Sequence, residues 1–274
     1  MKEAELSPDS PPVANCVPGI AQSLALCALF FGMSIAVSLT LTLVRRFAHV
    51  EVELFLWLLA QQVIAWPVTI WVGLRWSRVR FREACPLTRF PIRIVPALLI
   101  ATFGATILLL AGAPLIPIPE QLNTVMAHAI ASSSRVATLF SVVLVGPVAE
   151  ELFFRGLVLR GYLGRYSMVK AVWASALLFA FFHLNPWQAL VALPLGLGFA
   201  WLFVRTGSLV PSILCHATAN FSTNFLFYPL ALLLGYDSHS AEVSGNFPPS
   251  MLAIGAVMTS LGGFILFRQL YRPR

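Results

Sequence analysis

Three ionisable side chains lie close together inside an apolar stretch of this sequence. The segment GPVAEELFFRGLVL contains Glu150, Glu151 and Arg155 among small and apolar residues. Glu151 and Arg155 are four residues apart, so in a helix they share a face and can form an ion pair. Glu150 is rotated by about 100° from Glu151 in such a helix, and it therefore needs a partner on another element. The spacing predicts a structural ion pair beside a carboxylate that could accept a proton.

Two later apolar stretches supply candidate partners. In SALLFAFFHL, His183 follows Phe179 by four residues, and in LCHATANF, Asn220 follows His216 by four. Each pair therefore shares one face of a helix. Taken singly, each polar residue could be an interhelical hydrogen-bonding group. The whole set is difficult to explain as packing, because apolar side chains would fill the same space without the cost of desolvating charges.

The composition indicates that lipid surrounds these segments. Hydrophobic residues make up 58% of the 274 residues and charged residues only 11%, with a mean hydropathy of +0.83, whereas soluble domains are about 25% charged. Eight stretches are long enough, or nearly so, to be membrane spans: Ile20–Val44, Leu54–Leu74, Ile94–Ile116, Val136–Leu159, Ala171–Leu184, Gln188–Val204, Leu209–Leu234 and Ser250–Phe267. We predict an all-α, polytopic transmembrane bundle of about eight helices. Two of them, the fifth and sixth, are short and could form a hairpin.

The remaining features predict domain organisation and orientation. We expect a disordered cytoplasmic N-terminus (1–19), N-terminal spans (20–135), the helices with the polar motifs (136–234), and an outer loop, last span and cytoplasmic tail (235–274). Prolines inside spans, at Pro67, Pro147 and Pro194, predict kinks or local breaks.

Most of the 18 lysines and arginines fall on one side of such a bundle. The positive-inside rule therefore predicts cytoplasmic N- and C-termini in a multi-pass protein of the cell membrane. The basic segment 77–91 could lie on the anionic inner leaflet or be a plain positive-inside loop. The net charge of +7 does not predict nucleic-acid binding, because the cations do not form a basic stripe with aromatic residues. The four cysteines form no CxxC pair and predict no disulfide framework.

The three polar segments together resemble the motifs of the CPBP family of intramembrane proteases. This family, also called the Abi/CAAX proteases, is related to the type II CAAX prenyl endopeptidase. Its pattern is EExxxR, FxxxH and HxxxN, which corresponds here to Glu150-Glu151 with Arg155, Phe179 with His183, and His216 with Asn220. The resemblance covers roughly 146–225, and no motif residue departs from the pattern.

The resemblance implies hydrolysis of a peptide bond in a membrane-associated or lipidated protein by a glutamate-activated water. It assigns Glu150 as the general base and His183 as a residue that holds the water. His216 and Asn220 would donate to the oxyanion. Arg155 with Glu151 would orient Glu150 and His183, and Phe179 would support them. The roles of the two glutamates could be exchanged.

Other readings remain open from the sequence. Glu150, His183 and His216 could instead form a two-histidine, one-carboxylate zinc site, although HExxH is absent and Arg155 would repel a cation. We therefore favour no cofactor, with zinc as the alternative. A transporter or proton relay, or a non-catalytic immunity or partner protein, would also place polar groups in spans. The expected partners are a membrane-anchored protein or peptide substrate and the lipid bilayer.

Overall fold

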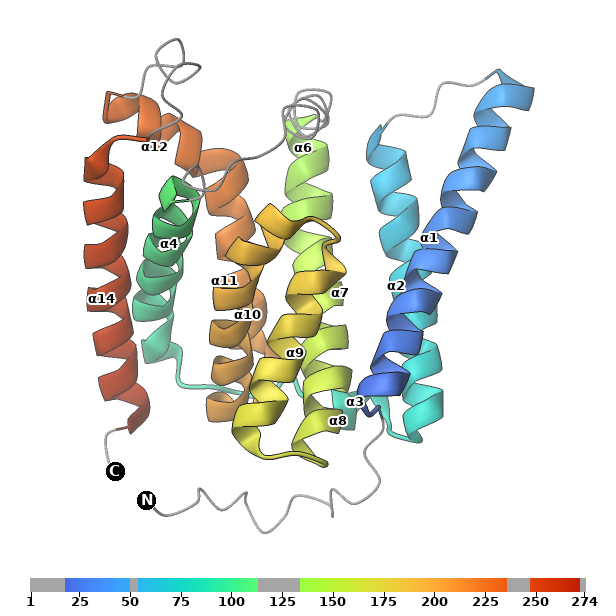
Figure 1. The fold of residues 1–274 in the computed structure, drawn as a ribbon, viewed down its shortest axis with the longest axis horizontal. Coiled ribbons are helices and arrows are strands. Elements are labelled where there is room, and N and C mark those ends of the chain that lie inside the picture. Colours follow the sequence, from blue (N-terminus) through green and yellow to red (C-terminus); the bar gives the residue numbers. More distant parts are fainter. Residues whose placement is uncertain (1–17, 50–53, 113–133, 236–246, 272–274) are drawn as a thin grey trace.

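The structure is a computed structural model of the chain that describes residues 18–49, 54–112, 134–235 and 247–271. Within these ranges all regular structure is helical, which confirms the predicted all-α bundle (Figure 1). The predicted disorder of the N-terminus falls, except for Pro18 and Gly19, outside the described residues. Most of the predicted outer loop, from 236 to 246, also lies outside them.

The first part of the bundle consists of α1 (Ile20–Ala48), α2 (Leu54–Ser77), the short α3 (Phe81–Ala84), the 3-10 turn η2 (Ile92–Ile94) and α4 (Val95–Gly112). One continuous helix follows, formed by α6 (Arg135–Thr138), η4 (Leu139–Val145), α7 (Gly146–Glu151), η5 (Leu152–Leu159) and α8 (Arg160–Leu163). The chain then forms α9 (Met168–Phe182), α10 (Pro186–Thr206), α11 (Leu209–Phe221), η6 (Ser222–Leu226), α12 (Phe227–Leu233) and α14 (Pro249–Tyr271).

Successive long helices run in alternate directions along the bundle (Figure 1). We call one end the basic end: α1 begins there, α3 lies there, and α2, α8, α10 and α14 finish there. Among the described residues, five helical segments are long and apolar enough to cross a membrane: Ile20–Ala48, Ile92–Gly112, Arg135–Leu163, Pro186–Thr206 and Pro249–Tyr271. The fold is therefore that of a helical membrane protein.

The hairpin of α9 and α10 differs from the prediction in the length of its second arm. Helix α9 has 15 residues and is short, whereas α10 has 21 and is long enough to span. Its N-terminus begins earlier than expected because the Asn185 side chain caps it and accepts from the backbone N–H of Trp187 at 3.1 Å. Pro186 then occupies the first turn, where a missing N–H costs nothing.

The predicted local break at Pro147 takes the form of a wide helical turn. Proline has no N–H, and immediately before it the backbone N–H of Gly146 donates to the carbonyl of Ser141, five residues back. The segment η4 is thus π-helical, and a second π-helical segment, η5, follows Glu151. The glutamates therefore lie between two wide turns, a feature that is frequent at functional sites.

Close backbone packing joins α14 to α4. A Cβ atom on Gly104 would lie 2.6 Å from the Cβ of Met258, so the two helices approach as closely as they do because this position is glycine. Small residues permit such approach in membrane bundles, where the hydrophobic effect does not drive helix association. Helix α4 in turn packs against α11 and supports one of the helices that carry the polar motifs.

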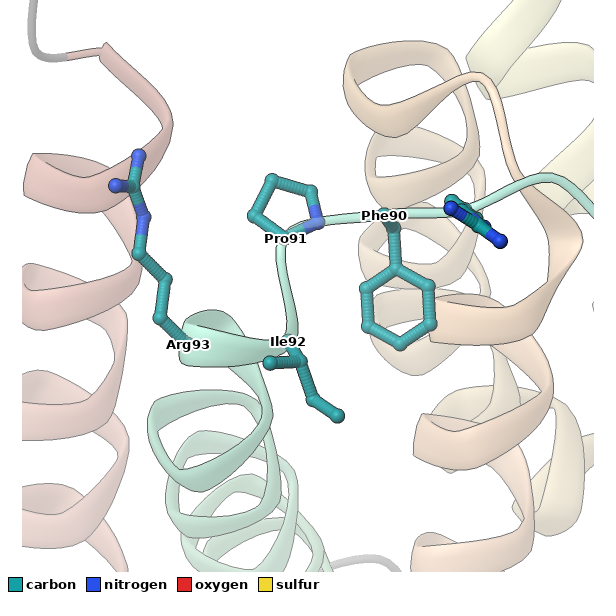
Figure 2. Close-up of a pocket in the computed structure, with 5 residues that line it drawn as sticks. Phe90, Pro91, Ile92 and Arg93 are labelled. Atoms are coloured by element: carbon teal, nitrogen blue, oxygen red, sulfur yellow. The ribbon is translucent and has the colours of Figure 1, made fainter.

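The connection between α3 and α4 crosses the basic end of the bundle. Residues 89–93 line an open pocket of about 680 Å³, and Arg93 extends from it towards α14 (Figure 2). The connection is tied to the turn before α11, since the Ser208 hydroxyl donates to the carbonyl of Thr88 at 2.8 Å. The three cysteines in the described ranges, Cys27, Cys85 and Cys215, are free and buried.

Candidate active site

Three packed elements carry the polar motifs. Glu150 and Glu151 end α7, and Arg155 lies in η5. His183 caps the C-terminus of α9, while His216 and Asn220 lie on α11. Helix α11 contacts both α7 and η5, and α9 contacts η5. The sequence separation between the motifs is therefore bridged by direct helix packing.

Glu151 is the centre of a buried polar network. Its Oε1 accepts from Arg155 Nη1 at 2.9 Å, which confirms the predicted ion pair. The same oxygen lies 2.9 Å from His216 Nδ1. Glu151 and Arg155 are wholly inaccessible to solvent, at 0% exposure. Because an isolated buried charge is costly, each member of this network requires the others.

Arg155 is held by more than its carboxylate. Its Nη2 donates to the carbonyl of Gly196 at 2.9 Å, and its guanidinium lies over the rings of Phe179 and Phe199, 4.5 Å and 5.4 Å from their centroids. Both ring faces attract the cation. A Cβ on Gly196 would come within 2.8 Å of the Phe179 ring and 3.3 Å of Arg155 Nη2, so glycine makes room for this contact.

His216 has a fixed ring orientation. The ring stacks on Phe199, with centroids 5.1 Å apart, and meets the Phe179 ring edge-on at 5.5 Å. Since Nδ1 faces a carboxylate oxygen, we assign the Nδ1 proton to this bond. His216 Nε2 then points towards Glu150, 3.7 Å from its Oε2. That separation is too long for a direct hydrogen bond.

Glu150 is more accessible than its wholly buried neighbour Glu151. Its side chain is 20% exposed, but Oε2 itself is buried and has no hydrogen-bond partner in the described part of the chain. A buried carboxylate oxygen without a donor is unfavourable unless a ligand or water satisfies it. The predicted closeness of Glu150 to a histidine is confirmed for His216.

The other two predicted residues lie at the edges of this network. His183 Nδ1 donates to the carbonyl of Phe179 at 2.9 Å, and its ring meets the Phe179 ring edge-on at 5.1 Å. Asn220 Nδ2 donates to the carbonyl of Val142 in η4 at 2.8 Å. Each side chain keeps polar capacity, because the imidazole has a second nitrogen and the amide a second N–H.

The arrangement changes one expectation from the sequence. Glu151 and Arg155 were expected to orient Glu150 and His183, whereas in the structure Glu151 contacts His216. His183 and His216 instead both contact one ring, that of Phe179. The rotation of α11 about its axis decides this pairing, and helical spacing within one segment cannot indicate it.

The side chains do not gather into the alternative zinc site. Across the described ranges, no three His, Cys, Asp or Glu side chains are placed to hold a metal ion. Glu150 and His216 approach one another, but His183 Nδ1 is engaged by its own helix. The guanidinium of Arg155 also lies beside the network and repels a cation. The predicted set of Glu150, His183 and His216 therefore does not fit a zinc ion in this arrangement.

A comparison with known protein families finds a match for the segment that carries the polar motifs. Residues 132–222 match the family model described as Type II CAAX prenyl endopeptidase Rce1-like. The match supports the resemblance to the CAAX protease family, and we call the matched residues the Rce1-like domain. The matched segment contains all three motifs and overlaps the helices predicted to carry the site, 136–234. No curated protein and no solved structure matches the chain.

Three residues that contact the network or the η4 turn before it were not predicted from the sequence. Gly196 and Phe199 belong to α10, which lies within the Rce1-like domain but carries none of its motifs. Gln62 lies on α2, outside the matched residues, and its amide reaches η4. The one available signal was an uncharged polar pair, Gln61-Gln62, inside an apolar stretch.

Proposed function

We propose that the chain is an intramembrane endopeptidase in which Glu150 activates a water to cleave a peptide bond of a membrane-anchored protein. The observation that carries the proposal is the contrast between the two glutamates. Glu151 is wholly buried and its Oε1 is bound by Arg155 and His216, whereas the side chain of Glu150 is 20% exposed. Each glutamate has an Oε2 without a donor among the described residues, but only the side chain of Glu150 is accessible. The match to the CAAX protease family supports the reaction class. The contrast favours Glu150 over Glu151 as the base.

The proposed reaction begins when Glu150 takes a proton from water as the oxygen attacks the substrate carbonyl. His183 Nε2 can accept from the water, because its Nδ1 proton is held by the Phe179 carbonyl. The oxyanion then accepts from the second N–H of Asn220 and from His216 Nε2–H in its imidazolium form. The peptide C–N bond breaks, and the leaving amine takes the proton from Glu150.

Replacing the base should slow turnover strongly without unfolding the protein. The change Glu150→Gln retains shape and hydrogen bonding, and we expect the rate to fall by at least about 10²-fold. Comparing membrane proteomes of cells carrying this variant and the unchanged protein should reveal an uncleaved membrane-anchored precursor. A peptide spanning its cleavage site then serves as the substrate for the purified proteins.

Two other functions predict different results in this experiment. A transporter or proton relay would lose ion flux in Glu150→Gln without accumulating a precursor. A non-catalytic partner protein would leave hydrolysis of the peptide unchanged. Equal precursor levels in both strains, with no hydrolysis by the purified protein, would contradict the proposed protease.

The glutamic mechanism makes a separate prediction about metals. Purified, active protein should keep its activity after exhaustive treatment with a strong chelator. The measurement is the hydrolysis rate together with the zinc content of the sample. Stoichiometric zinc, with activity lost on chelation and restored by adding the ion, would replace this mechanism with a metal-dependent one.

We further infer that the basic end of the bundle faces the cytoplasm, as the positive-inside rule requires. Cysteines introduced at Arg80, between α2 and α3 at the basic end, and at Ser134, before α6, should then label from opposite sides with an impermeant reagent. Native Cys85 adds little background, because burial raises the pKa of its thiol to about 12 and keeps it protonated below that pH. Cys16 would be replaced beforehand. Labelling of both introduced cysteines from one side would contradict the alternating arrangement.

A further inference from the structure

Helix α2 lies outside the Rce1-like domain but contacts the turn that precedes the glutamates. The partly buried Gln62 donates from Nε2 to the carbonyl of Ser141 at 2.9 Å. The same carbonyl accepts from the backbone N–H of Gly146 and closes the wide turn of η4. Gln62 therefore holds the turn from which Pro147 and Glu150 follow.

The other half of the Gln62 amide has no hydrogen-bond partner in the part of the chain that the structure describes. Its Oε1 is buried, and no donor among the described residues reaches it. Leaving a buried acceptor unsatisfied is costly, so such atoms in native structures call for an explanation. The orientation of the amide is set by the bond from Nε2 to a carbonyl, which can only accept. The orphaned atom is thus the acceptor oxygen.

Gln62 and Glu150 face one space beside Gly146. The point that a Cβ of Gly146 would occupy lies 3.5 Å from Gln62 Nε2 and 3.8 Å from Glu150 Oε1. It also lies 3.0 Å from the carbonyl of Ser141. Because glycine has no side chain, the amide and the carboxylate approach the same space from different helices.

We propose that Gln62 is a positioning residue of the active site, acting on Glu150 and on the water that Glu150 activates. Its Nε2 fixes the wide turn and so the place of Glu150, and its Oε1 accepts a hydrogen bond from that water. The donor and acceptor capacities of the amide are then both used. This proposal rests on the proposed function, since it assigns Gln62 to the hydrolysis assigned to Glu150.

The neighbouring residue provides a matched control. Gln61 also lies on α2, but its Nε2 donates in another direction, to the Ser38 hydroxyl of α1 at 3.1 Å. The changes Gln61→Met and Gln62→Met each remove one interhelical hydrogen bond of α2 and keep an unbranched side chain of similar length. The two variants differ in one respect: the amide lost in Gln62→Met faces the candidate active site, whereas the amide lost in Gln61→Met faces α1.

The test measures kcat, KM and the thermal midpoint of both variants with the substrate peptide. We expect Gln62→Met to lower kcat about tenfold, the effect of one lost hydrogen bond in the transition state, with little change in KM. Gln61→Met should keep kcat, and the two thermal midpoints should fall similarly. Unchanged kcat in Gln62→Met, or equal losses in both variants that follow their stability, would overturn the proposal.

A double variant separates positioning from a general structural role. If Gln62 acts through Glu150, adding Gln62→Met to Glu150→Gln should cause little further loss, whereas independent effects would multiply. Multiplication would overturn the proposal. Should Gln62→Met fail to fold, Gly146→Ala offers a second test, because its methyl group fills the same space. Gly146→Ala should lower kcat in the protein that has Glu150, but it should not lower kcat further in Glu150→Gln.

The same measurements distinguish this inference from the proposed function. If Glu150→Gln retains full activity, the assignment of the base fails. If Glu150→Gln is inactive while Gln62→Met retains the kcat of the unchanged protein, only the assignment of Gln62 fails.

Discussion

Arginines occur in two contrasting environments in this chain. Arg155 lies inside the bundle, where a carboxylate, a backbone carbonyl and two aromatic rings surround its guanidinium. Arg89 and Arg93 line the open pocket at the basic end (Figure 2), are exposed, and form no ion pair among the described residues. The same side chain is thus buried among several protein partners in one place and exposed in the other.

The two environments differ in whether solvent can take the place of a protein partner of the guanidinium. At the basic end, water or lipid headgroups can solvate a guanidinium, so a protein partner adds little free energy. In the interior no such substitute exists, and the loss of one member leaves another charge uncompensated. The interior charges therefore form an interdependent unit, and the peripheral charges act separately.

The largest expected effect is on stability and comes from breaking the interior unit. The change Arg155→Met leaves Glu151 buried without its cation, and we expect a loss of about 3–5 kcal/mol in the free energy of unfolding. Thermal denaturation in detergent would show it as a lower midpoint. The double variant Glu151→Gln/Arg155→Met should recover part of the loss. A single variant as stable as the unchanged protein would show that the network does not depend on the pair.

A smaller effect, this time on kcat, is expected from removing the uncharged amide of Asn220 at the edge of the network. Asn220→Ala removes a proposed oxyanion donor and should lower kcat by about 10²–10³-fold, as for other single oxyanion donors. Asn224 is the matched control, since its Nδ2 donates only to the backbone carbonyl of Asn220 and its side chain is exposed. Kinetics on the substrate peptide would compare the two. A similar loss in Asn224→Ala would indicate a structural role for this part of α11.

The smallest effect is expected at the basic end. Arg89→Gln and Arg93→Gln should change the free energy of unfolding by no more than about 0.5 kcal/mol, as is usual for exposed positions, and leave kcat unchanged in detergent. Denaturation and kinetics under the conditions used for Arg155→Met give a direct comparison. A loss comparable to that of Arg155→Met would remove the distinction between the two environments.

Local features of the chain were predictable because they depend on neighbours in sequence. Apolar stretches of nearly 20 residues predict helices in lipid, and a spacing of four residues predicts the pair of Glu151 with Arg155, which the structure contains. The length of α10 was underestimated, although its cap at Asn185 and Pro186 is also a local signal. The amino-acid sequence alone thus determined the helices, their alternation and the identity of the polar residues.

Contacts between helices were decided by the tertiary structure. The pairing of Glu151 with His216, the approach of Gly196 to Arg155 and the reach of Gln62 to η4 all depend on how each helix is rotated about its axis. Wide turns on both sides of α7 change that rotation from its regular value. Rotation is set by side-chain packing between segments far apart in sequence. For this reason the motifs predicted which residues gather, while only the folded bundle decided which atoms meet.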